Sequence, residues 1–99
     1  FGSRPAGTLV VDAGARLALC ERGKSLLPSG VRDARGHFQA GALVSICDEQ
    51  DAEIARGIVN YSADDVRRIR GLKTSAVRKL VGAGATDEVV HRDHLVLND

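Results

Sequence analysis

The 99-residue sequence has no methionine, no tryptophan, two prolines and only three aromatic residues. The core of such a small domain must be built from Val, Leu, Ile and Ala, and a chain of this length has room for one core. Because there is no initiator methionine, we expect a piece of a longer protein. No apolar run approaches the roughly 20 residues that span a bilayer, and no signal peptide is recognisable, so we expect a cytoplasmic protein without membrane contact.

An excess of one charge is also missing, because 14 Lys and Arg residues stand against 13 Asp and Glu residues, for a formal net charge of +1. This balance excludes a strongly basic chain, so nucleic-acid binding would need a local patch of cations. The two cysteines, Cys20 and Cys47, have apolar neighbours and no metal-ligand spacing. We expect them to be reduced thiols that pack as small apolar side chains in the core.

Short strand patterns and short helix patterns alternate along the chain. Apolar and β-branched runs predict six strands, at residues 8–11, 31–34, 42–47, 53–61, 88–90 and 94–98. The strand at 42–47 is apolar on both faces, which predicts a central position. No long strand–helix–strand unit is present. The sequence therefore predicts an α+β, mainly β domain: a small curled or barrel-like sheet of about six strands with two or three short helices.

Capping residues set the expected helix boundaries. Asp12 and Gly23 are placed to cap a helix over residues 13–22, and Ser62 opens a second helix that Gly71 closes. A third helix is expected to begin at a cap formed by Thr74 or Ser75 and to end at Gly82. Gly57, in the middle of a predicted strand, indicates a bulge or sharp bend that curls the sheet.

Two stretches match parts of phosphate-transfer motifs. Gly23-Lys24-Ser25 matches the end of a P-loop, but the first glycine position of that motif is Ala18, inside a predicted helix. His91-Arg92-Asp93 matches the start of a protein-kinase catalytic loop without the other kinase motifs. A zinc pair at His91 and His94 would need a helix, where the sequence favours a strand. We therefore expect neither a catalytic residue nor a metal site in this chain.

A local cluster of cations is a further signal. Six basic residues and no acidic residue lie between positions 66 and 80: Arg67, Arg68, Arg70, Lys73, Arg78 and Lys79. Such a cluster could contact several phosphates and would bind nucleic acid in a salt-sensitive way. Clusters of this kind are more often the solvated faces of helices, and acidic residues flank this one on both sides. No aromatic residue is interleaved to stack on bases.

Several glycine-punctuated stretches resemble the PUA domain, a small β-rich module of many RNA-modifying enzymes. They are VDAGA at 11–15, GKSLLPSGV at 23–31, the spacing Gly36-x-Phe38-x-x-Gly41 and IARG at 54–57. Four stretches are similar, more narrowly, to the C-terminal PUA domain of the bacterial glutamate 5-kinase family: SLLP at 25–28, RGIVNYS at 56–62, IRG at 69–71 and VHRDHLVL at 90–97. The resemblance covers about residues 7–98 and leaves residues 1–6 as a linker or cloning remnant.

The resemblance implies a pseudo-barrel of six strands with small helices. It also implies a longer parent enzyme that transfers the γ-phosphoryl group of ATP to the side-chain carboxylate of L-glutamate in proline biosynthesis. ATP and Mg²⁺ would be held by a separate N-terminal amino-acid-kinase domain, and this chain would hold no cofactor. It would be a non-catalytic domain that packs against the kinase domain, with a regulatory or structural role, in a parent that could form a homo-oligomer. The alternative is an RNA-binding module.

In RNA-binding PUA domains, the first helix and the glycine-containing loop after it line the contact surface. The matching positions here are Gly14, Arg16, Arg22, Lys24, Ser25 and Gly30. With four members of the cation cluster, Arg67, Arg68, Arg70 and Lys73, they make up the candidate surface for RNA binding or docking. Gly14 lies in the first turn of a predicted helix, where alanine is a better helix former. We therefore expect another backbone, or a nucleic-acid strand, to approach closely there.

Overall fold

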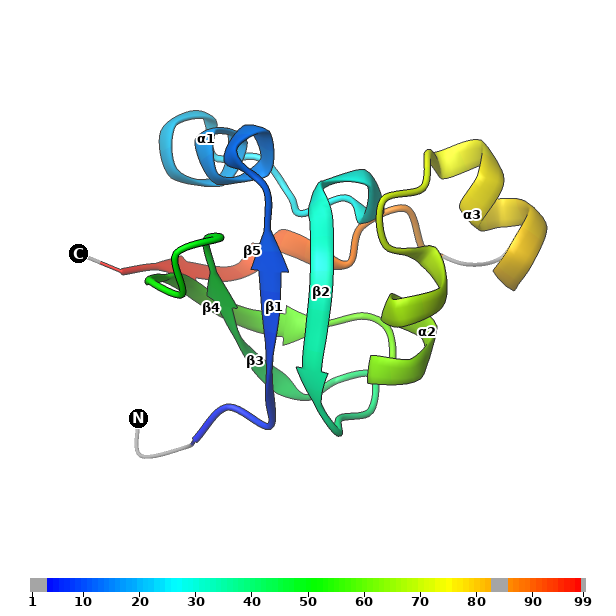
Figure 1. Cartoon of the computed structure of the whole chain (residues 1–99), viewed down its shortest axis with the longest axis horizontal. Helices are drawn as coiled ribbons and strands as arrows, with labels where there is room; N and C mark the ends of the chain where they lie inside the picture. The colour runs from blue at the N-terminus through cyan, green and yellow to red at the C-terminus, as the bar shows by residue number, and fades with distance from the viewer. Residues whose placement is uncertain (1–3, 83–85, 99) are drawn as a thin grey trace.

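The computed structural model describes residues 4–82 and 86–98, and Figure 1 shows a curled sheet flanked by helices. Within these residues the strands are β1 (Gly7–Val11), β2 (Val31–Gly36), β3 (Leu43–Cys47), β4 (Glu53–Val59) and β5 (Val90–Leu97). The helices are α1 (Ala13–Arg22), α2 (Ala63–Ile69) and α3 (Thr74–Val81), with a short 3₁₀ helix, η1, at Pro28–Gly30. This architecture confirms the predicted α+β, mainly β class. No helix in the described parts of the chain is long and apolar enough to cross a membrane.

The five strands form one mixed sheet in the order β2-β1-β3-β4-β5. β1 and β3 are parallel, and the other neighbouring strands are antiparallel. The predicted central position of residues 42–47 is confirmed, because β3 is the middle strand and Val44 to Cys47 are buried. In Figure 1, β1 and β2 pass in front of β4 and β5. An isolated bridge between Leu26 and Val90 joins the segment before β2 to the opposite edge strand and curls the sheet.

The core is aliphatic, as the composition predicted. The sheet contributes side chains such as Leu9, Val44 and Ile46, all at 0% exposure. Helix α2 is fixed firmly to this core through its buried Val66 and Ile69. Each fully buried aliphatic side chain of this kind stabilises the fold by about 1.5–3 kcal/mol relative to an exposed one. Helix α2 is therefore a firm support for any polar side chain that it carries toward the sheet.

Three of the four predicted caps of the first two helices are confirmed. The exception is the end of α2, where the C-cap is Arg70 and the predicted Gly71 follows one residue later, in the left-handed conformation with φ of +75°. The Asp12 carboxylate accepts a hydrogen bond of 2.7 Å from the Ala15 N–H at the start of α1. Gly23 ends α1 in the left-handed conformation, with φ of +60°. At the start of α2, the Ser62 hydroxyl accepts a hydrogen bond of 3.2 Å from the Asp65 N–H. Capping hydrogen bonds span only a few residues, which makes them visible in the sequence.

The expected cap of the third helix is wrong. Helix α3 begins at Thr74, and its N-cap residue is Lys73, which makes no side-chain capping hydrogen bond. The helix therefore starts one residue earlier than a Thr74 cap would allow. The buried Val77 anchors the first turns of α3 against the core. This packing decides where α3 starts, because tertiary contacts outweigh a cap worth about 1 kcal/mol.

The two strands predicted at 88–90 and 94–98 are replaced by one strand, β5, which begins at Val90 and ends at Leu97, so the described sheet has five strands rather than six. The polar residues His91 to His94 suggested a break between two strands. The structure keeps them in one strand because this part of β5 lies on the surface, where polar side chains remain in water. A register shift in the β4–β5 pairing, between Gly57 and Val59, accommodates the extra residues.

The cysteine prediction is half wrong. Both thiols are free, and Cys47 is buried as expected, but Cys20 is exposed. Helix α1 turns Leu19 toward the core. Successive helical residues are rotated by about 100°, so Cys20 is directed toward solvent.

The bulge predicted at Gly57 is confirmed, and the reason for a glycine is steric. A Cβ atom at this position would lie 2.6 Å from Cγ1 of Val90 and 2.9 Å from the carbonyl oxygen of His94. The second atom belongs to the backbone of β5 and cannot move aside without disturbing the strand. The close crossing of β4 and β5 thus depends on the absence of a side chain at Gly57.

We predict that Gly57→Ala lowers the free energy of unfolding by about 1–3 kcal/mol, because the new methyl group overpacks the β4–β5 crossing. Gly14→Ala is the matched control. Its new Cβ would meet only Oδ1 of Asp12, at 3.5 Å, and alanine stabilises a helix by up to about 1 kcal/mol relative to glycine. Urea unfolding followed by circular dichroism measures both variants. Equal stability of the two variants would contradict the steric explanation.

Candidate functional site

Four of the predicted site residues meet in one cavity between α1 and the loop that follows it. Gly14, Lys24, Ser25 and Gly30 line this cavity of about 370 Å³, which we call the α1 cavity. The rest of its wall is mostly small or apolar, with Asp12 and Ser29 as further polar members. The loop folds back on α1 and so brings Lys24, Ser25 and Gly30 close to Gly14.

The loop is held against α1 at two points. The Asp12 N–H donates a hydrogen bond of 3.0 Å to the carbonyl of Gly30. A Cβ atom at Gly30 would lie 2.5 Å from Cβ of Ala15, so the contact needs a glycine. The close approach of another backbone expected at Gly14 is absent from the described residues, since the nearest atom to a Cβ there is the Asp12 carboxylate oxygen. An approach by a nucleic-acid strand at Gly14 stays a prediction.

A second cavity of about 380 Å³ adjoins the first and shares Lys24, Ser25 and Leu27 with it. Its other wall consists of His91 and Arg92 at the start of β5 and of Glu88 just before that strand. The Ser25 hydroxyl accepts a hydrogen bond of 2.9 Å from the Arg92 N–H and so joins the two walls. Local sequence patterns do not predict this junction, because the two residues lie 67 positions apart.

The other two predicted residues of α1 lie outside both cavities. Nε of Arg16 is 3.6 Å from Oδ2 of Asp48, in the turn between β3 and β4. Arg22 is exposed in the last turn of α1. Lys24 is therefore the one predicted cation that lines the α1 cavity.

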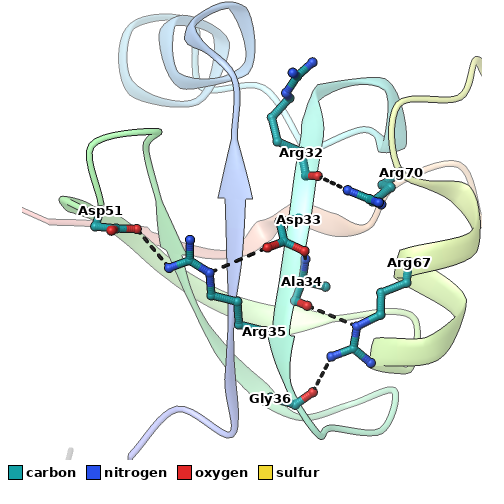
Figure 2. Close-up of polar contacts among 8 residues, drawn as sticks. All are labelled: Arg32, Asp33, Ala34, Arg35, Gly36, Asp51, Arg67 and Arg70. Atoms are coloured by element: carbon teal, nitrogen blue, oxygen red, sulfur yellow. Dashed lines mark hydrogen bonds and ion pairs between the residues drawn. The ribbon is translucent and has the colours of Figure 1, made fainter.

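Two arginines of the predicted cation cluster bind the protein itself (Figure 2). Nε and Nη2 of Arg67 donate hydrogen bonds of 3.1 Å to the carbonyl of Ala34 and 2.7 Å to that of Gly36. Nη1 of Arg70 donates a hydrogen bond of 2.6 Å to the carbonyl of Arg32. The three acceptors are alternate residues of the edge strand β2, so they face one side of it. We call Arg67 and Arg70 the β2 clamp.

The remaining members of the candidate surface are scattered around the clamp. Nη1 of Arg68 is 3.6 Å from Oδ1 of Asp65 one turn earlier in α2. Lys73 is exposed at the start of α3. The cations at residues 67–73 thus form no single face open to a ligand, since two of them serve to hold the edge of the sheet.

The groups with displaced pKa values have structural explanations. The hydrogen bond with Asp51 raises the pKa of Arg35, which reaches from β2 across β1 (Figure 2). Hydrogen bonds from Ser45 and then Asn98 lower the pKa of Glu53. Burial raises the pKa of Tyr61. None of Arg35, Glu53 and Tyr61 lines the α1 cavity or its neighbour.

The two cavities are suited to hold a polar or anionic group through cations, hydroxyls and backbone groups. The P-loop match is not a phosphate loop, because Gly23 ends helix α1 where that motif needs a preceding strand. His91-Arg92-Asp93 lies within strand β5 and not in a catalytic loop. Across residues 4–82 and 86–98, no three His, Cys, Asp or Glu side chains are grouped so that they could hold a metal ion.

We predict that Arg67→Ala lowers the free energy of unfolding by about 1.5–3 kcal/mol, because it removes charge-assisted hydrogen bonds to two carbonyls of β2. The control is Arg68→Ala, next along the same helix. Arg68 is exposed and near only its own helix, so we expect a change within about 0.5 kcal/mol. Urea denaturation compares the two variants. A loss at Arg68 as large as that at Arg67 would show that the clamp does not hold the edge strand.

Comparisons with known proteins agree with this architecture. The family model described as "PUA domain" matches residues 7–81. Among curated proteins, the chain is 48% identical over 99 residues to a glutamate 5-kinase of Synechococcus sp. (strain JA-3-3Ab) and 45% identical over 97 residues to that of Thermoanaerobacter sp. (strain X514). These matches cover 100% and 98% of this chain, but 27% and 26% of the relatives. The chain therefore spans about a quarter of their length.

Solved structures share the fold. A PUA domain from Aeropyrum pernix K1, in a tartrate complex, has a TM-score of 0.63 and 25% sequence identity, and the match covers 88% of this chain and 43% of that one. A chain of an archaeal box H/ACA sRNP complex has a TM-score of 0.60 and 18% identity over 90% of this chain and 26% of its own. With three quarters of its residues matched by the family model, and with the same fold in solved relatives, the chain belongs to the PUA domain family.

Proposed function

We propose that this chain is the non-catalytic C-terminal PUA domain of a cytoplasmic glutamate 5-kinase and that it regulates or stabilises the kinase part of that enzyme. The observation that carries the proposal is the 48% identity over the whole chain to a glutamate 5-kinase of which the chain spans 27%. A match this extensive indicates one complete module of a larger protein, with the remaining length available for other domains.

In this proposal, the parent enzyme transfers the γ-phosphoryl group of ATP to the side-chain carboxylate of L-glutamate. ATP and Mg²⁺ are bound by the N-terminal amino-acid-kinase domain, which this chain lacks. The chain supplies a firm surface instead of reacting groups. In support, Arg67 and Arg70 hydrogen-bond to β2, and the displaced pKa values of Arg35, Glu53 and Tyr61 follow from hydrogen bonds and burial within the fold.

The test compares the full-length kinase with a version that ends before residue 7. We expect the shortened enzyme to keep ATP-dependent phosphorylation of glutamate, because the reacting groups lie outside this domain. We expect its Mg²⁺ demand, its inhibition by proline or its thermal stability to change. Initial rates over a range of Mg²⁺ and proline concentrations and a thermal melt measure these effects. Identical behaviour of the two enzymes on every measure would reject the proposed role.

A second candidate function is RNA binding, and the joined cavities favour it. Lys24 lines both cavities and Arg92 lines the second, so two cations stand beside the single carboxylate of Glu88 in the second cavity. Exposed Arg22 follows at the end of α1. Lysine and arginine side chains in this arrangement could contact successive phosphates of a nucleic-acid backbone. The lining has no Phe, Tyr or Trp side chain for base stacking, so the affinity would depend mainly on charge.

This candidate predicts salt-sensitive binding of tRNA that depends on Lys24. We expect Lys24→Ala to weaken binding and to reduce the slope of log affinity against log salt by about 1, the effect of one lost phosphate contact. The control is Arg4→Ala, which removes an exposed cation at the end of β1 opposite α1 and should leave the slope unchanged. A titration at several salt concentrations from about 50 mM upward measures both. Absence of binding at the lowest salt, or binding that ignores salt, would exclude this function.

A further inference from the structure

The outer face of the sheet carries a groove away from α1. It has a volume of about 550 Å³ and runs over β3, β4 and β5. Leu43, Ile58 and Val96 supply its apolar wall, one residue from each strand. The polar groups that line it come from Arg56, Asp93, His94 and Asn98. We call this feature the outer groove.

The apolar residues of the outer groove converge because of the strand register. Leu43 on β3 faces Ile58 on β4, and Val96 on β5 faces Arg56 on β4. Val96 is 73% exposed, more than any other large apolar side chain in the described residues. The exposed Leu17 lies apart, on α1. Leu43 and Ile58 are half-buried beside Val96. A contiguous apolar surface of this kind marks a place that another protein surface covers.

Two of the polar groups of the groove, Arg56 and Asn98, are already paired within the domain. Nε of Arg56 donates to both carboxylate oxygens of Glu53, at 3.1 and 3.2 Å. The Asn98 amide donates to the same carboxylate at 2.9 Å, and the Ser45 hydroxyl also donates to it. These hydrogen bonds hold the pKa of Glu53 below its usual range, so it is charged at neutral pH. Arg56 and Asn98 therefore present no unpaired charge to a partner. The Asp93 carboxylate, 75% exposed and 3.5 Å from Nδ1 of His91, also lines the groove, so the apolar surface that fits here is one that leaves Asp93 in water.

The path of the chain places one partner beside the groove. The Ala6 N–H donates a hydrogen bond of 2.8 Å to the carbonyl of Leu43, a residue of the groove wall. Figure 1 shows the chain coming in at the foot of β1, below β3. Any chain that precedes this domain in a longer protein is therefore delivered to the rim of the outer groove. The glutamate 5-kinases that match this chain have about three quarters of their length outside the match.

We propose that the outer groove is the docking site for an apolar surface of the polypeptide that precedes this domain in the longer protein. This inference rests on the proposed function, since the preceding polypeptide is then the kinase domain. A tether that ends at the rim gives the attached domain an effective concentration in the millimolar range. The attached domain is thereby favoured over a second, free copy of this domain, which has only its bulk concentration.

The test measures how accessible residue 96 is in the full-length protein and in the 99-residue chain. Both carry Cys20→Ser, to remove the exposed thiol, together with Val96→Cys. The control is Leu80→Cys on α3, because Leu80 is also an exposed apolar side chain, at 48%, and lies outside the groove. Labelling with a maleimide is followed by mass spectrometry of the peptide that contains the new cysteine. Urea unfolding of the 99-residue chain checks that each variant folds.

We expect the Val96→Cys thiol to react at least about tenfold more slowly in the full-length protein than in the 99-residue chain. A tenfold difference corresponds to a docking free energy of about 1.4 kcal/mol. Cys at position 80 should react equally in both proteins. If the protection at position 96 does not change when the full-length protein is diluted, the groove is covered by the domain attached in the same molecule, as proposed. Equal labelling at position 96 in both proteins overturns the proposal. Protection in the 99-residue chain that increases with concentration also overturns it, in favour of a second copy.

The two experiments can reject the proposed function and the proposed docking site independently. Labelling at residue 96 measures only whether the groove is covered. The comparison with the shortened enzyme measures activity, regulation and stability. Protection at residue 96 with unchanged behaviour of the shortened enzyme would reject the regulatory role and keep the docking site. Changed behaviour of the shortened enzyme without protection at residue 96 would keep the role and reject this surface.

Discussion

A curled sheet that does not close has two edge strands, and the backbone groups along each edge need hydrogen-bond partners. In this domain the edges are β2 and β5. Arg67 and Arg70 of α2 donate to three alternate carbonyls of β2. At the other edge, the Leu26 bridge to Val90 pairs the start of β5 with a loop. Both arrangements tie segments distant in sequence to the sheet, so satisfying the edges also positions α2 and the loop that walls the α1 cavity.

The need to satisfy the sheet edges decides which cationic side chains are available to bind other molecules. A guanidinium group that donates to backbone carbonyls has fewer donors free for a phosphate, and moving it would expose an edge strand. The cluster at residues 67–73 is therefore largely an internal support, although its composition resembles a nucleic-acid patch. The surfaces left for partners are the joined cavities beside α1, where Lys24 contributes a cation, and the apolar outer groove across β3, β4 and β5.

The two surfaces differ in chemistry and suit different occupants. The α1 cavity is bordered by hydroxyls, backbone groups and a lysine, which favour a polar or anionic ligand. The outer groove has apolar side chains beside a polar network centred on Glu53 that is complete within the domain. A single domain can thus pack against a neighbouring domain with one face and present the other face to solvent. The two proposed functions are therefore compatible in geometry.

Sequence reasoning succeeded where the deciding interaction is local. Asp12 and Gly23 bound α1 as expected, because a capping hydrogen bond or a left-handed turn involves only a few neighbouring residues. The two apolar faces of β3 predicted its central place. Reasoning failed where packing overrides a local pattern. Cys20 is turned to solvent by the rotation of α1, and the polar stretch at 91–94 continues as strand because β5 lies at an edge.

By itself, the sequence determined an aliphatic core, the number and type of most elements, and a family resemblance that covers nearly the whole chain. Only the tertiary structure decided what the long charged side chains do. Arg67 meets its acceptors 31 and 33 residues away, and Ser25 meets Arg92 across 67 residues. Local spacing holds no information about such partners, because the order and curl of the strands bring them together. The same curl places Leu43, Ile58 and Val96 side by side, and so creates a docking surface from three separate stretches.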